Sequence, residues 1–147
     1  MGYRRAAARF CRLHAYAKIC VMKWSIGVDV VSIGRIEQLA SRHADRFFKH
    51  VYTPVEVEYC LKKKKTSSLH FAARFAAKEA LVKAIGTGFR DGIAFREIET
   101  IHDPLGKPVL VLYGKALEYA RRQGFSCFEL SITHDPLVAI AVVLACS

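Results

Sequence analysis

Apolar and polar residues alternate in the first strongly patterned segment of the chain, SIGVDVV at residues 25–31. One side of the extended chain carries Ile26, Val28 and Val30, and the other side carries Gly27 and Asp29. This period of two predicts a half-buried β-strand with Asp29 on the face opposite the valines.

The pattern then changes to helical periods. Residues 34–52, GRIEQLASRHADRFFKHVY, place apolar residues on one side of a helix. A short helix is expected from TPVEVEYCL, with Thr53 as its N-cap and Pro54 in its first turn. The segment KKKKTSS follows as an exposed linker, and a long helix is expected at 70–85 with Gly86 as its C-cap.

The second half of the chain is dominated by strand patterns. The Pro/Gly turn PLGK separates residues 93–103 from residues 108–113 and predicts a β-hairpin. A short amphipathic helix ending at Gly124 precedes two more strands, in FSCFELSITHD and LVAIAVVLA. This order of elements predicts an α+β domain in which a largely antiparallel sheet packs on a long central helix.

Length and composition set further limits. A chain of 147 residues that is 52% hydrophobic suits one domain, which we place at residues 25–147. No apolar run approaches the roughly 20 residues that a membrane helix needs, so we expect no membrane partner. The five cysteines are widely spaced and form no C-x-x-C pair, so they suggest neither a disulfide framework nor a zinc site.

The charge is concentrated at the N-terminus. The net charge is +10, and residues 1–23 hold six basic residues and no acid. This acid-free pattern is typical of an organellar transit peptide. The alternative is an extension of the reading frame with the functional start at Met22. We therefore treat residues 1–24 as a leader or extension; the chain is expected in the cytoplasm, or in an organellar matrix if the leader is a transit peptide.

The segment FAARFAAKEALVKAIGTG at residues 71–88 leaves no wide solvent face on its helix. It nevertheless carries Arg74, Lys78, Glu79 and Lys83, and ionised groups in apolar surroundings are rarely stable without a partner. The three cations exceed what one glutamate can neutralise. They therefore indicate an anionic partner, of which phosphate is the usual one.

Two carboxylates are candidate metal ligands. Asp29 on the strand and Glu79 on the long helix are the kind of oxygen donors that hold Mg²⁺ together with substrate phosphates. The alternative is that Glu79 simply pairs with Lys83, four residues later in the favoured orientation.

Three further patterns each leave two interpretations open. The GTG sequence at 86–88 resembles a phosphate-binding loop, but it follows the helix end that repels anions. Lys62–Lys65 is a solvated loop or a phosphate contact. His134, where SITHD leaves a strand, is a structural residue or a donor to a ligand.

Four cations recur along residues 34–52, with no acid among them: Arg35, Arg42, Arg46 and Lys49. On a straight helix they occupy one narrow band.

A basic helix face in a chain with a pI near 9.6 is also what a nucleic-acid-binding module would show. The charge excess lies mostly in the leader, however, and aromatic residues do not interleave with basic ones as a stacking platform requires. We therefore expect no nucleic-acid partner.

Three segments, IGVDVVSIGRI, FAARFAAKEALVKAIGTG and SITHD, closely resemble in order and separation those of the holo-acyl-carrier-protein synthases, the small bacterial type of 4′-phosphopantetheinyl transferase. The resemblance covers about residues 25–147. It implies transfer of 4′-phosphopantetheine from coenzyme A to a serine of apo acyl carrier protein, with release of 3′,5′-ADP, in fatty acid biosynthesis. It also implies a homotrimer with active sites at subunit interfaces.

Matched position by position, the resemblance implies that Asp29 and Glu79 bind Mg²⁺, which also binds the coenzyme A diphosphate. It implies a phosphate contact for Lys83 and places His134 near the adenosine 3′-phosphate. Glu79 acting through a water molecule is the first candidate for the base that deprotonates the serine, and direct deprotonation by a side chain is the second.

The remaining expected contacts are with the nucleotide and the carrier protein. Lys78 and Arg74 are expected to help Lys83 neutralise phosphate, with at most a secondary role for Gly86. Lys107 and Pro108, in a GKP sequence, resemble a loop that reaches a neighbouring subunit's nucleotide. The acidic carrier protein is expected to meet Arg35, Arg42 and Arg46. A catalytically dead carrier-binding scaffold is disfavoured because both metal ligands and Lys83 are present.

Overall fold

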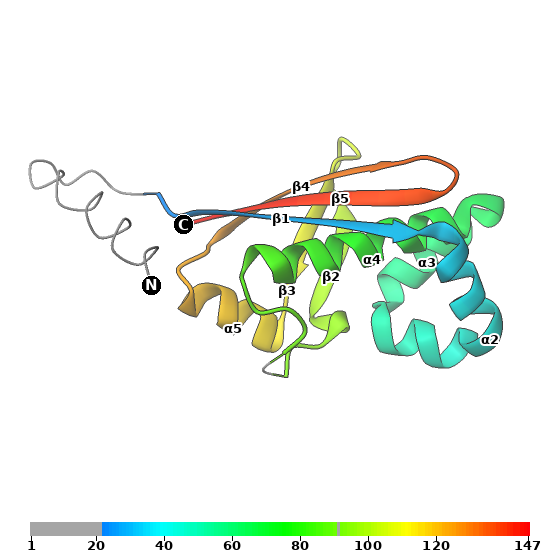
Figure 1. Ribbon diagram of the computed structural model, residues 1–147, viewed down its shortest axis with the longest axis horizontal. Coiled ribbons are helices and arrows are strands. Elements are labelled where there is room, and N and C mark those ends of the chain that lie inside the picture. The colour runs from blue at the N-terminus through cyan, green and yellow to red at the C-terminus, as the bar shows by residue number, and fades with distance from the viewer. Residues whose placement is uncertain (1–21, 91) are drawn as a thin grey trace, which may run out of the picture.

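The computed structural model of the chain describes residues 22–90 and 92–147 (Figure 1). The leader expected at residues 1–24 lies outside the described residues except for its last three positions. The helices are α2 (Ile33–Val51), α3 (Pro54–Lys62), α4 (Ser67–Ala84) and α5 (Gly114–Arg122), with short 3₁₀ turns η2 (Lys64–Thr66) and η3 (Phe95–Glu97). The strands are β1 (Trp24–Ser32), β2 (Ile98–His102), β3 (Pro108–Leu112), β4 (Cys127–His134) and β5 (Val138–Cys146).

Both sheets are antiparallel. The larger sheet has the strand order β1-β5-β4, and the predicted hairpin forms a separate two-stranded sheet of β2 and β3. The α+β class and the antiparallel pairing are therefore confirmed, although the strands divide between two sheets. In the described part of the chain, no helix is long and apolar enough to cross a membrane.

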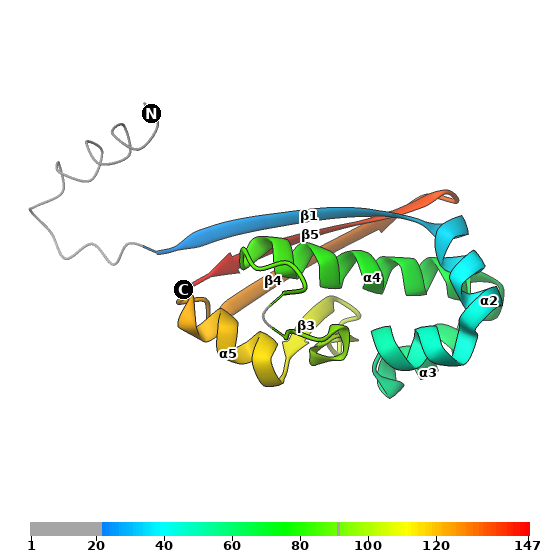
Figure 2. The same cartoon turned by 60° about the horizontal axis from the view of Figure 1, so that its bottom comes forward.

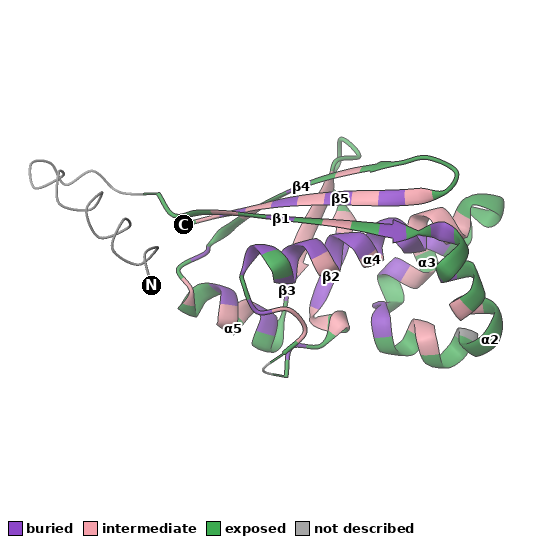
Figure 3. Ribbon diagram, in the orientation of Figure 1, coloured by how far each residue is buried: buried purple, intermediate pink, exposed green. Residues whose placement is uncertain are grey.

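Helix α4 is the centre of the fold. It runs beneath β1 and β5, with the hairpin and α5 on its other side (Figure 2). Buried residues occur all round it, as the absence of a solvent face predicted (Figure 3). It ends in a Schellman motif, in which Gly86 has φ +82° and the N–H groups of Gly86 and Thr87 donate to the carbonyls of Lys83 and Val82. Gly86 therefore stops the helix.

Small residues bring α4 unusually close to the sheet. Ala80 and Ala84 of the helix are buried, and β5 turns Ala139, Ala141 and Ala145 inward. The tightest approach is at Gly27 of β1: a Cβ atom there would lie 1.9 Å from the Ala80 carbonyl oxygen and 2.6 Å from the Ala84 nitrogen. Only glycine fits this position, since both obstacles are backbone atoms of a helix.

Strand β1 packs against the helix with the face that carries Gly27 and Asp29, and not with the more apolar face that carries Val28 and Val30. Gly27, Asp29 and Val31 face the helix, whereas Ile26, Val28 and Val30 are 64%, 49% and 60% exposed. Asp29 does lie opposite the valines, as predicted. The apolar side of the alternation, however, forms the outer face of the sheet, because the inner face has room only for small side chains near Gly27.

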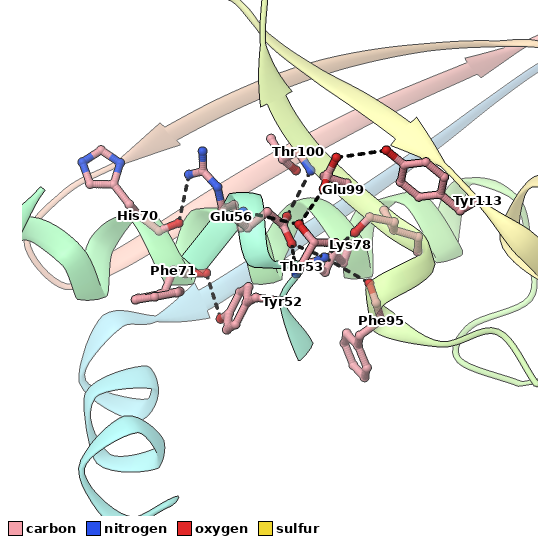
Figure 4. Close-up of polar contacts among 12 residues, drawn as sticks. Tyr52, Thr53, Glu56, His70, Phe71, Lys78, Phe95, Glu99, Thr100 and Tyr113 are labelled. Atoms are coloured by element: carbon pink, nitrogen blue, oxygen red, sulfur yellow. Dashed lines mark hydrogen bonds and ion pairs between the residues drawn. The ribbon is translucent and has the colours of Figure 1, made fainter. Parts of the chain in front are cut away.

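Helix α3 begins as predicted, with Thr53 as N-cap and Pro54 in the first turn. Thr53 and Glu56 form a reciprocal capping box, with the Thr53 N–H donating to Glu56 Oε2 at 2.9 Å. The same carboxylate also accepts a hydrogen bond from the Thr100 N–H at 3.0 Å. Glu56 is fully buried, and its hydrogen bond with Thr100 links the start of α3 to β2 (Figure 4).

The partner of Glu56 is Lys78, and this corrects the expectation that Lys78 contacts phosphate. The Lys78 amine is fully buried and lies 2.7 Å from Glu56 Oε2. It also donates to the carbonyls of Phe95 and Ile98, so all three of its hydrogen-bonding positions are used inside the protein (Figure 4). Burial lowers the pKa of Lys78, and the facing Glu56 carboxylate opposes that shift. Lys78 therefore fastens α4 to α3 and the hairpin.

We predict that Gly27→Ala lowers the free energy of unfolding by about 3 kcal/mol, because β1 must move away from α4 to admit the methyl group. Urea unfolding followed by circular dichroism measures this. Gly34→Ala is the matched control, since the nearest atom to a Cβ there is Ser32 Oγ at 3.9 Å. In helix α2 that change should stabilise the protein by up to about 1 kcal/mol. Equal effects of the two substitutions would contradict the proposed close contact.

Candidate active site

Asp29 and Lys83 join β1 to the last turn of α4. The Lys83 amine donates to Asp29 Oδ1 at 2.6 Å and to the Val28 carbonyl oxygen at 3.1 Å. The Asp29 side chain is 15% exposed and the Lys83 side chain 50% exposed, so the pair lies at the edge of the core and open to solvent on one side. The close packing at Gly27, two residues earlier, brings these groups within reach.

Glu79 lies one turn before Lys83 on α4 and is half-buried. Its pKa is raised, first by burial and then by the nearby charge of Asp29, while Lys83 and Arg35 oppose the shift. Among the described residues, Lys83 forms its ion pair with Asp29 and not with Glu79. The simple helical Glu79–Lys83 ion pair is therefore not what the fold uses, and the carboxylate of Asp29 on β1 lies close enough to Glu79 for its charge to raise the pKa of Glu79.

This pair of carboxylates fits a hard divalent cation. Mg²⁺ is usually held by one or two protein carboxylates together with substrate phosphates and water, and Asp29 and Glu79 supply such a donor set. The Lys83 ammonium already contacts Asp29, so the position accepts positive charge. The described residues contain no group of three or more His, Cys, Asp or Glu that could hold a metal ion, so substrate oxygens would have to complete a site here.

Arg74 lies on α4 nearer its N-terminus and is only 3% exposed. Its Nη1 donates to the His70 carbonyl oxygen at 3.3 Å, and its guanidinium stacks over the Tyr59 ring at 4.1 Å. In the described part of the chain, Arg74 Nε and Nη2 have no hydrogen-bond partner. A buried guanidinium with unused donors is costly, and an anion would satisfy it.

Other basic groups surround Arg74. His70 and His102 both have a lowered pKa, mainly from burial and then from the charge of Arg74 and Lys63. His134 contributes in the same direction to His70, so it lies near this cluster. We call Lys63, His70, Arg74, His102 and His134 the basic cluster.

His134 also lines a pocket of about 460 Å³ with Lys65 and Thr66, between the start of α4 and the turn that joins β4 to β5. Lys65 comes from the lysine run, which is exposed throughout. Two of these four lysines therefore lie near the histidines: Lys65 lines the pocket with His134, and Lys63 belongs to the basic cluster.

Lys107 and Pro108 lie apart from the carboxylates in the fold. They line a pocket of about 470 Å³ with Ser131, Val142 and Leu144, and none of Asp29, Glu79 and Lys83 lines it. The Lys107 amine pairs with Glu129 at 2.5 Å. A single chain therefore does not bring the GKP loop to the carboxylates.

The expected basic band lies on α2 and is exposed at Arg35, Arg42, Arg46 and Lys49. The helix is not straight, however, because His43 leaves helical geometry with φ −144° and ψ 35°. The single narrow stripe calculated for a straight helix is therefore wrong beyond this kink. Arg35 lies close enough to the carboxylates to lower the pKa of Glu79, so the band begins at the candidate site.

Sequence reasoning missed Tyr59, His70 and His102. Tyr59 stacks on His102 at 4.6 Å between ring centroids and meets His70 edge-on at 5.7 Å. These residues come from α3, α4 and β2, and no local spacing connects them. The sequence pointed to them only indirectly, because an arginine in apolar surroundings, Arg74, was expected to need a partner.

The profile of the 4′-phosphopantetheinyl transferase superfamily matches residues 25–141. The holo-[acyl-carrier-protein] synthase of Geobacter sp. (strain M21) is 46% identical over 123 residues, which cover 84% of this chain and 98% of that protein. That of Syntrophus aciditrophicus is 44% identical over 118 residues, covering 80% and 91%.

Solved structures agree with this. The crystal structure of the holo-[acyl-carrier-protein] synthase from Neisseria meningitidis has a TM-score of 0.74 and 39% identity, and covers 82% of this chain and 96% of that one. The Helicobacter pylori enzyme, solved in complex with coenzyme A, has a TM-score of 0.70 and 34% identity, and covers 82% and 98%. The chain therefore belongs to the 4′-phosphopantetheinyl transferase superfamily and, within it, to the holo-[acyl-carrier-protein] synthases.

Proposed function

We propose that this enzyme transfers 4′-phosphopantetheine from coenzyme A to a serine of apo acyl carrier protein, releases 3′,5′-ADP, depends on Mg²⁺, and serves fatty acid biosynthesis. The observation that carries the proposal is the group formed by Asp29, Glu79 and Lys83, from two elements that pack through Gly27. Proteins of the same fold are named holo-[acyl-carrier-protein] synthase, and one of them was solved in complex with coenzyme A.

Each of these three side chains has a task in the transfer. Asp29 and Glu79 would hold Mg²⁺, which when bound supplies charge stabilisation to the diphosphate and orients it. The Lys83 ammonium neutralises charge that develops on the leaving phosphate. Glu79, acting through a water molecule, is the first candidate for the base that accepts the serine proton, because its carboxylate lies next to the position proposed for the reacting diphosphate.

The basic cluster is suited to the other end of the nucleotide. Arg74 has unused donors, His134 acts with Arg74 on the pKa of His70, and His134 lines a pocket with Lys65. We assign these cations to the adenosine 3′-phosphate. Gly86 keeps its role as the end of α4.

Mass spectrometry of apo acyl carrier protein tests the function directly. After incubation with the full chain, coenzyme A and Mg²⁺, the carrier should gain the mass of one phosphopantetheine group at its serine. EDTA should prevent the gain, and added Mg²⁺ should restore it. An unmodified carrier would refute the reaction, and modification that persists in EDTA would refute the metal requirement.

We predict that Asp29→Asn and Glu79→Gln each lower kcat/KM by about a hundredfold or more, because the cation loses one of its two protein carboxylates. Glu118→Gln is the matched control, since Glu118 is an exposed carboxylate on α5. Activity at several Mg²⁺ concentrations measures the effect, with circular dichroism to verify folding. A variant that keeps most of its activity would remove that residue from the metal site.

The carrier protein is proposed to dock on α2. Acyl carrier proteins are acidic around the target serine, as the family resemblance implies, and Arg35, Arg42 and Arg46 offer exposed positive charge that begins beside Glu79. Such charges mainly steer association and fix orientation.

Arg35→Ala should therefore raise KM for the carrier protein by about fivefold, with little change in the affinity for coenzyme A. Added salt should weaken the wild-type enzyme more than the variant, because the variant has already lost an attractive charge. Arg121→Ala, an exposed cation on α5, is the control. Steady-state kinetics with each substrate varied in turn decides the point, and equal losses for both substrates would count against this docking surface.

A homotrimer is also part of the proposal. The outer face of the β1-β5-β4 sheet exposes Ile26, Val28 and Val30, which lie opposite Leu144, Val142 and Ile140 of β5. A contiguous apolar face of this kind is typical of an interface. The pocket beside Lys107 and Pro108 is lined by the same Val142 and Leu144, so a neighbouring copy could bring that loop to the nucleotide.

We predict that Val28→Lys lowers the sedimenting mass from three copies toward one and reduces coenzyme A binding, because a charge enters the apolar face. Val55→Lys is the control, since Val55 on α3 is similarly exposed, at 54% against 49%. Analytical ultracentrifugation measures the mass. A wild-type chain that sediments as one copy, or a Val28 variant that stays trimeric, would refute this interface.

A further inference from the structure

The first residue of β4 and the last residue of β5 are both cysteines. Cys127 and Cys146 lie directly opposite each other in the antiparallel register of these strands. Direct partners in such a pair lie on the same face of the sheet. We propose that this pair is a reversible dithiol–disulfide site, oxidised by low-molecular-weight disulfides such as diglutathione.

The geometry suits a disulfide. Cα atoms of directly opposed residues in antiparallel strands are about 4.5–5.5 Å apart, and disulfides span Cα separations of roughly 4.4–6.8 Å. The Cys146 Sγ atom lies 3.7 Å from the Cys127 carbonyl oxygen, so its side chain already points toward the opposite strand. Cys127 is the first residue of β4 and Cys146 is the last residue of β5.

The two thiols differ in access, and this sets the order of reaction. Cys127 is exposed, whereas Cys146 is half-buried and its pKa is raised, first by a hydrogen bond with the Cys127 side chain and then by burial. The other described cysteine, Cys60, is fully buried in the core, and burial raises its pKa to about 12. Cys127 is therefore the thiol that meets an external disulfide first.

The exchange is balanced in two steps. The Cys127 thiolate attacks one sulfur of the small disulfide, forms a mixed disulfide and releases one small thiol. The Cys146 thiolate then attacks the Cys127 sulfur, forms the Cys127–Cys146 bond and releases the second small thiol. The protein loses two electrons and two protons, and one small disulfide becomes two thiols.

The bond would lock the edge strand β4 to the central strand β5 at the end of the sheet where both termini of the described chain lie (Figure 1). The disulfide would restrict the unfolded chain around the β4–β5 hairpin and raise the melting temperature. This effect does not depend on the reaction proposed above.

Tryptic peptide mapping tests the site, because no Lys or Arg follows Arg122 and the peptide 123–147 carries Cys127, Cys146 and no other cysteine. After treatment with excess diglutathione and then iodoacetamide, this peptide should be unalkylated and lighter by two hydrogen atoms. Dithiothreitol should restore two alkylated cysteines. The oxidised protein should melt higher by roughly 5 °C, and the reduced protein should return to the original value.

Cys127→Ser and Cys146→Ser should each abolish the light peptide and the rise in melting temperature. Cys11→Ser and Cys20→Ser are the matched controls and should leave both unchanged. The proposal fails if peptide 123–147 remains doubly alkylated after oxidation. It also fails if Cys127 keeps the small thiol as a mixed disulfide, or if the disulfide joins cysteines of two different chains.

Discussion

The contact between β1 and α4 at Gly27 is the constraint on which the site depends. A strand and a helix normally keep a layer of side chains between their backbones. At Gly27 that layer is missing, because backbone atoms of α4 occupy the space that a side chain on β1 would need. The alanines of α4 and β5 extend this close packing along the helix. As a result, Asp29 on β1 lies near Glu79 and Lys83 on α4, at the edge of the core.

The charged residues of α4 are divided among three environments by their position around and along the helix. Lys78 faces inward and is neutralised by Glu56, within a network that also satisfies the start of α3 and the carbonyls of Phe95 and Ile98. A buried ion pair repays the loss of hydration only when its hydrogen bonds are complete, as they are here. Glu79 and Lys83 face the solvent edge near Asp29, and Arg74 faces the aromatic ring of Tyr59. One helix thus serves both the stability of the fold and the chemistry of the site.

The outer face of the sheet is the surface on which the proposed trimer depends. Its exposed apolar residues need a covering surface, and its GKP loop lies away from the carboxylates. Association through this face would answer both needs, because it would cover Ile26, Val28 and Val30 and supply the loop from a neighbour.

Local features were predictable from the sequence. The N-cap at Thr53, the helix stop at Gly86, the PLGK hairpin and the placement of Asp29 opposite the valines all follow from interactions within a few residues, which a local pattern records. The segments that resemble a known family also directed attention to Asp29, Glu79 and Lys83; in the structure, Lys83 pairs with Asp29 and both act on the pKa of Glu79.

Only the tertiary structure decided which face of β1 is buried and which partner each charge takes. Lys78 pairs with a residue 22 positions away and Lys83 with one 54 positions away, and Arg74 stacks on a ring from another helix. An ion pair depends on the distance between two groups and on their hydration, and both are set when distant elements pack. Residue types and spacing determined that the charges of α4 needed partners, whereas the close contact at Gly27 and the packing around it determined what those partners are.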